Sequence, residues 1–127
     1  MASFSRKEKL KSKKLFGELF VEGKTLNVFP VKLLYTQCDF AEVQFKAGVV
    51  APKRKFKSAV KRNRIKRLLR ESYRLNKHLL FNNVEGNFAF LFLYLGNTMP
   101  NAKEVDKAMI QLLKAFIKKE SHEKSDQ

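Results

Sequence analysis

The chain has 127 residues, which suits one domain of ordinary size, and its 44% hydrophobic content excludes a disordered basic tail. Its formal net charge of +15 at pH 7 is typical of proteins that bind nucleic acid. No stretch has the roughly 20 apolar residues of a membrane span, and the charged N-terminus does not resemble a secretory signal. The single Cys38 excludes an internal disulfide. We therefore expect a cytoplasmic protein.

A short amphipathic helix is predicted near the N-terminus. The apolar residues that recur on one face are Leu15, Phe16, Leu19 and Phe20. Ser12 is placed to cap this helix, and Gly23 ends it. The spacing of Phe16 and Phe20, one turn apart, favours core packing, and a stacking platform for unpaired bases is the alternative. Tyr35, on a strand, carries the same two interpretations.

Three segments further along the chain are predicted to form strands. Residues 26–37 and 43–51 are rich in β-forming side chains, with a turn at 39–42 between them. Pro30 argues for a bulge or an edge position in the first segment. The apolar run at 88–95 is too short to span a membrane and indicates a buried strand.

Between these strands lies a strongly basic segment. Ten of the eighteen residues from Lys53 to Arg70 are Lys or Arg, and none is acidic. A helix over 58–80 turns an apolar side toward the sheet. Its cationic side holds Arg62, Asn63, Lys66, Arg67, Arg70 and Arg74. Like charges at i,i+4 and cations in the first helical turn are both unfavourable, so we expect anions to bind there.

A final amphipathic helix begins after the capping pair Asn101 and Glu104, and the polar tail from about residue 121 is expected to be flexible. The whole chain, 1–127, is predicted to be a single nucleic-acid-binding domain with an ordered core at about 6–118. The fold class is α+β, a sandwich of one small mixed sheet and three helices in the order α-β-β-β-α-β-α.

Three motifs resemble one family, the protein subunit of bacterial ribonuclease P. Residues 59–71, which contain Arg62-Asn63-Arg64, resemble its Arg-Asn-Arg motif, and Phe16, Phe20 and Gly23 match its Phe-x3-Phe-x2-Gly signature. Residues 48–54 resemble its central strand and the paired basic turn that follows. One departure is the segment 55–58, where the family commonly has a glycine and one residue fewer, so we expect a different loop path there.

The resemblance implies a left-handed βαβ crossover and a function. The protein would be the non-catalytic subunit of an endoribonuclease that removes the 5′ leader of precursor tRNA, with the chemistry carried by the RNA subunit and Mg²⁺. A 1:1 complex with ribonuclease P RNA is implied. The residues implied to bind that RNA are Lys61, Arg62, Asn63, Arg64, Lys66, Arg67 and Arg70. The residues implied to line a cleft for the single-stranded leader are Phe16, Phe20, Tyr35, Lys53 and Arg54.

Composition alone leaves other functions open. A structural rRNA-binding protein of the ribosomal type has the same charge profile, and the combined motifs favour the ribonuclease P reading over it. A DNA-binding regulator would require a short turn between two helices, which the sequence lacks, so we expect no DNA partner. A self-contained metal-dependent nuclease would require converging carboxylates, and the twelve acids are scattered. The positions of any metal sites are not predicted.

Overall fold

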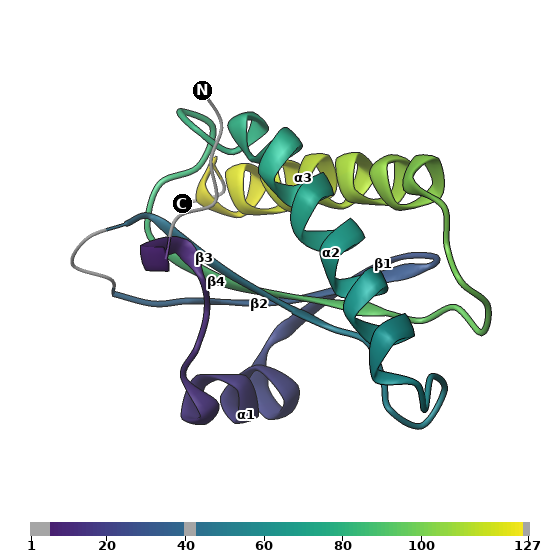
Figure 1. Ribbon diagram of the computed structural model, residues 1–127. Helices are drawn as coiled ribbons and strands as arrows, with labels where there is room; N and C mark the ends of the chain where they lie inside the picture. The colour runs from purple at the N-terminus through teal and green to yellow at the C-terminus, as the bar shows by residue number, and fades with distance from the viewer. Residues whose placement is uncertain (1–5, 40–42, 126–127) are drawn as a thin grey trace.

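The computed structural model describes residues 6–39 and 43–125, and in this part of the chain a four-stranded sheet lies between two layers of helices (Figure 1). The elements are η1 (Arg6–Glu8, 3-10), α1 (Lys13–Glu22), β1 (Lys24–Val28), β2 (Val31–Gln37), β3 (Phe45–Val50), α2 (Ala59–Asn76), η2 (Lys77–Leu79, 3-10), β4 (Phe88–Tyr94) and α3 (Ala102–Ser125). Both the α+β class and the order α-β-β-β-α-β-α are confirmed.

The strand order is β1-β2-β4-β3, which leaves β3 at one edge of the sheet. β2 is antiparallel to β1 and β4, whereas β3 is parallel to β4 and is connected to it through α2. The segment 26–37 is not one strand with a bulge. Val28 and Val31 are paired across a two-residue turn at Phe29 and Pro30, so the chain reverses direction there. Pro cannot donate to a strand ladder, and a turn position avoids that loss.

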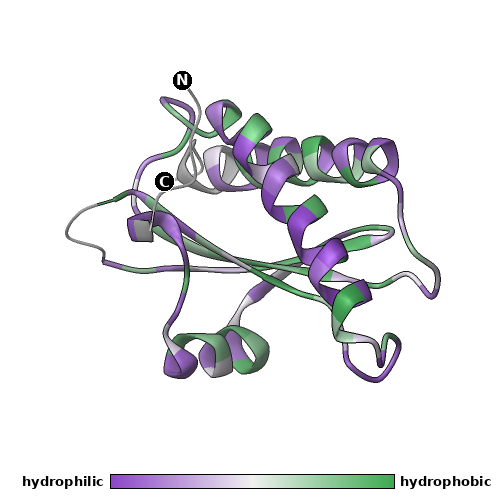
Figure 2. Cartoon of the chain, in the orientation of Figure 1, coloured by the Kyte–Doolittle hydropathy of each residue, from purple (hydrophilic) through white to green (hydrophobic). Residues whose placement is uncertain are grey.

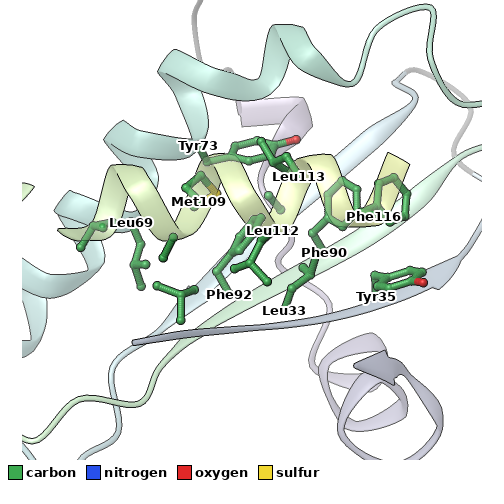
Figure 3. Close-up of a cluster of buried hydrophobic side chains, with 14 of the residues drawn as sticks. Leu33, Tyr35, Leu69, Tyr73, Phe90, Phe92, Met109, Leu112, Leu113 and Phe116 are labelled. Carbon is green, nitrogen blue, oxygen red and sulfur yellow. The ribbon is translucent and has the colours of Figure 1, made fainter. Parts of the chain in front are cut away.

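The sheet is covered on both faces. α2 and α3 pack on one face, where Leu33, Phe90, Phe92 and Met109 belong to the larger core (Figure 3). α1 lies on the other face, where Leu19 joins a smaller cluster that includes strand residues of β2 and β4. Every residue of β4 except Leu93 is buried, which explains its uninterrupted apolar sequence and confirms the predicted buried strand.

The helices begin where the sequence predicts. The hydroxyls of Ser12 and Ser58 accept backbone N–H groups at the starts of α1 and α2, and Asn101 Oδ1 accepts the N–H of Glu104 at 2.8 Å. α3 continues to Ser125, well into the segment predicted as a flexible tail. Within the described ranges, no helix combines the length and apolar composition needed to cross a membrane.

Candidate nucleic-acid interface

The outer side of α2 is a cationic surface held by an apolar inner side. Ile65, Leu69 and Tyr73 are almost completely buried against the sheet and α3. Of the residues on α2 predicted to bind RNA, the exposed ones are Lys61, Asn63, Arg64, Arg67 and Arg70, and the half-buried ones are Arg62 and Lys66. In Figure 2 the ribbon of α2 is coloured mostly as hydrophilic, with hydrophobic residues between the hydrophilic ones. Burial of the inner side therefore offsets the repulsion among the cations. We call these seven residues the α2 face.

The one acid on α2, Glu71, interacts most strongly with Arg74 and more weakly with Arg67 of the α2 face. Glu71 forms an ion pair with Arg74 at 3.0 Å. The hydrogen bond from Arg74, followed by its charge, lowers the pKa of the Glu71 carboxyl. The cations of the α2 face have no comparable acid on their own helix. The net field over this surface is therefore positive, as a polyanion requires.

Arg62 differs from the other residues of the α2 face because it bonds within the protein. Its Nη1 donates to the carbonyls of Phe56, at 2.7 Å, and Lys57, at 2.9 Å. Lys55 Nζ donates to the carbonyl of Leu95 at 2.7 Å. Phe56 is buried, and its ring centroid lies 5.8 Å from that of Tyr94. The segment that departs from the family pattern is thus anchored at three points, and Arg62 serves partly as one of its anchors.

The N-terminal segment lies along the open edge of β3. The N–H of Leu10 donates to the carbonyl of Ala47 at 2.9 Å, and Lys9 forms an isolated parallel bridge with Ala47. Just before it, Glu8 pairs with Lys77 at 2.6 Å, and the side chains of these two residues are only 18% and 8% exposed. A well-shielded ion pair with a short contact resists separation more than a surface pair does. The segment is therefore fixed between the sheet and the end of α2.

A hollow of about 190 Å³ forms where this segment, α1, β3 and α2 meet. Its lining residues are Lys9, Leu10, Lys11, Phe16, Ala47, Gly48, Val49 and Arg70. A Cβ on Gly48 would lie 3.0 Å from Cζ of Phe16, so glycine allows the aromatic ring to rest against the strand. We call this site the edge hollow. Three cations around one aromatic ring match what single-stranded nucleic acid binds.

The structure brings together only part of the predicted leader cleft. Phe16 lines the edge hollow, and Phe20 is 55% exposed on the same helix. Lys53 and Arg54 are exposed in the turn after β3 and are not among the residues that line the edge hollow. The edge hollow instead connects Phe16 to Arg70, and so connects the predicted cleft to the α2 face.

Tyr35 is a correction to the predicted cleft. Its ring is completely buried on the opposite face of the sheet, 4.8 Å from the ring centroid of Phe116 and nearly perpendicular to it. Its hydroxyl donates to Glu120 Oε2 at 3.1 Å, in the core beneath α3. Tyr35 therefore serves the core in this fold, and we remove it from the candidate site.

Two residues of the edge hollow, Lys9 and Lys11, were missed from the sequence. They lie upstream of α1 and carry no motif of their own. Their place beside Arg70 depends on β3 being an edge strand, which local sequence patterns do not reveal. In the described part of the chain, no group of three or more His, Cys, Asp or Glu residues is arranged to hold a metal ion.

The fold and these cationic surfaces define a small α+β protein with a surface suited to nucleic acid. Comparison with known proteins then gives its family. The family model described as Ribonuclease P matches residues 4–117, and the chain belongs to this family. It is 35% identical to the ribonuclease P protein component of Porphyromonas gingivalis over 109 residues, 83% of this chain and 80% of the relative. It is 32% identical to the same component of Petrotoga mobilis, covering 94% of this chain and 97% of the relative.

Solved structures agree on the fold. The RNase P protein from Thermotoga maritima superposes with a TM-score of 0.68 at 23% identity, covering 85% of this chain and 96% of that one. The RNase P protein of Staphylococcus aureus gives a TM-score of 0.66 at 18% identity, covering 85% and 94%. The family match supports the reading as a protein component of an endoribonuclease, and the ribosomal alternative is not favoured.

Proposed function

We propose that this protein binds ribonuclease P RNA through the α2 face and the 5′ leader of precursor tRNA through the edge hollow, in a 1:1 complex in the cytoplasm. Removal of the leader would form the mature 5′ end of the tRNA. The RNA subunit would carry the chemistry together with Mg²⁺. The observation that carries this proposal is the edge hollow itself, because it joins the aromatic residue of the predicted cleft to the basic helix.

The electrostatic part of the mechanism follows from charge. Two RNA molecules with dense phosphates repel each other, and a protein with a formal charge of +15 placed between them reduces that repulsion. Substrate affinity rises as a result, and fewer divalent cations are needed to screen the phosphates. The protein therefore acts by positioning and screening, without a protein group in the bond-breaking step.

The leader would be held mainly by its backbone and by one stacked base. Lys9, Lys11 and Arg70 surround the edge hollow and can contact successive phosphates, while Phe16 offers its ring for stacking. Stacking and phosphate contacts do not read base edges. Leader binding should consequently tolerate different sequences, as an enzyme that processes many tRNA precursors requires.

Reconstituted cleavage tests the proposal. Precursor tRNA is incubated at low Mg²⁺ with this protein alone, with a bacterial ribonuclease P RNA alone, and with both. We expect cleavage at the mature 5′ end only when both are present, and recovery of cleavage by the RNA alone at high Mg²⁺. Tight RNA binding without any stimulation would support a purely structural role. Cleavage by the protein alone would place the active site in the protein and contradict the proposal.

A further inference from the structure

A second hollow lies at the turn between β1 and β2, away from the edge hollow. It has a volume of about 420 Å³, within the range of small-ligand sites. Its walls come from the β1–β2 turn, the β4–α3 connection and the first turns of α3. Its lining includes one aromatic side chain and several polar or charged ones: Phe29, Asn97, Thr98, Glu104, Lys107 and Gln111. We call it the turn hollow.

Phe29 forms one side of the turn hollow and has no role in the core. It is 74% exposed, although its neighbours are fixed: Val28 pairs with Val31, and the N–H of Leu95 donates to the carbonyl of Pro30 at 2.7 Å. A single exposed apolar residue on a protein surface is ordinary. An aromatic ring on a rigid turn beside a polar hollow is a different arrangement, because it offers a stacking surface that costs little entropy to use.

The polar groups of the turn hollow can recognise a nucleobase. Asn97 and Gln111 provide amide donors and acceptors, which can pair with the edge of a base. Lys107 and Gln111 lie one turn apart on α3 and therefore on the same side of the helix. Glu104 and Lys107 line the hollow with opposite charges, so it has no net positive charge to favour a phosphate, and Glu104 can accept an exocyclic amino group.

The phosphates would lie next to the hollow rather than inside it. Asn97 and Thr98 also line a neighbouring hollow of about 320 Å³, whose other walls include Lys57 and Lys61. Tyr94 donates its hydroxyl to the carbonyl of Thr98 at 2.6 Å and so fixes the segment that separates the two hollows. A base beside Phe29 would thus have lysines within reach of its backbone, and these lysines continue into the α2 face.

We propose that the turn hollow binds one unpaired nucleotide of RNA, stacked on Phe29, with its base edge toward Asn97 and Gln111. This inference rests on the proposed function, since it requires an RNA partner. The ribonuclease P RNA and the precursor tRNA offer the same chemistry, and the test below separates them. A protein segment or a second copy of the chain is the competing occupant.

The test uses the assembled holoenzyme with Phe29 replaced by photoreactive p-benzoylphenylalanine. After irradiation, a crosslink to the ribonuclease P RNA without substrate assigns the nucleotide to that RNA. A crosslink only when precursor tRNA is present assigns it to the substrate. We expect one of these two results, mapped to an unpaired nucleotide. A crosslink to protein, or none to RNA, would overturn the proposal.

A pair of alanine variants provides the affinity measurement. Phe29→Ala should weaken binding of the crosslinked RNA by about 5- to 150-fold, the range for loss of one stacked base. Phe81→Ala is the matched control, because Phe81 is 46% exposed but follows η2, at the other end of α2 from the turn hollow. Equal affinities for the two variants would overturn the proposal. Stimulation of cleavage at low Mg²⁺ by the unmodified protein tests the proposed function separately.

Discussion

Arg62 and Arg67 lie on the same helix, but Arg67 is free to bind RNA, whereas Arg62 also stabilises the loop before α2. Arg67 is exposed, whereas Arg62 Nη1 holds the carbonyls of Phe56 and Lys57 at 2.7 and 2.9 Å. Hydrogen bonds from a charged donor contribute about 1.5–3 kcal/mol each when shielded, and Arg62 is only half-buried. We therefore expect Arg62→Ala to lower the free energy of unfolding by about 1–2 kcal/mol, and the Tm by about 3–10 °C.

For RNA binding the order of the two variants should reverse: Arg67→Ala should affect binding more than Arg62→Ala does. Arg67→Ala should leave the Tm unchanged and flatten the dependence of log K on log salt by about 0.7–0.9 unit, the value for one lost phosphate contact. Arg62→Lys is the informative control, because lysine keeps the charge but removes the guanidinium Nη1 that donates to both carbonyls. It should lower the Tm as Arg62→Ala does while preserving the salt slope.

The assay combines thermal unfolding of the free protein with binding to ribonuclease P RNA at several salt concentrations. If Arg62→Ala flattens the slope as much as Arg67→Ala does and leaves the Tm unchanged, then the bonds of Arg62 to the loop contribute nothing. The assignment of Arg62 as an anchor would then be refuted.

Three further outcomes follow from the packing around α1. Gly48→Val should displace the Phe16 ring, because even a Cβ at this position would lie 3.0 Å from it. The variant should lose about 1–3 kcal/mol of stability and also bind the leader more weakly. Unchanged unfolding and binding would contradict the close packing. Gly23→Ala should destabilise the end of α1, since a Cβ would lie 2.5 Å from the carbonyl oxygen of Leu19, and chemical denaturation would measure the loss. Burial, followed by nearby acids, raises the pKa of the Cys38 thiol. Its alkylation at pH 8 should therefore be slower than in the unfolded chain, and it should accelerate at higher pH. Equal alkylation rates at pH 8 would count against this shift.

Local patterns predicted most of the fold because each helix has an apolar side and a capping residue. The caps at Ser12, Ser58 and Asn101 are all formed. Pro30 predicts a bulge or an edge position within one strand, whereas the pairing of Val28 with Val31 makes it part of a turn between two strands. The local sequence of the segment does not predict that pairing.

Alternation within β2 groups Tyr35 with Val31 and Leu33 on one face, because Lys32 and Thr36 lie on the other and are only partly buried. The family resemblance placed Tyr35 in the leader cleft against this pattern. Which helices cover each face of β2 depends on tertiary packing, and the segment itself does not specify it. The meeting of Phe16 with Arg70 likewise depends on strand order, and the anchoring of Arg62 depends on backbone carbonyls that any sequence would provide.

The central claim is that the edge hollow holds the leader of the substrate. The most direct test measures the affinity of the assembled holoenzyme for precursor tRNA and for mature tRNA, with the unmodified protein and with Phe16→Ala, after circular dichroism has shown that the variant is folded. Phe16→Ala should weaken binding of precursor tRNA by about 1–3 kcal/mol and leave binding of mature tRNA unchanged. An equal loss for both RNAs, or no loss for either, would contradict it.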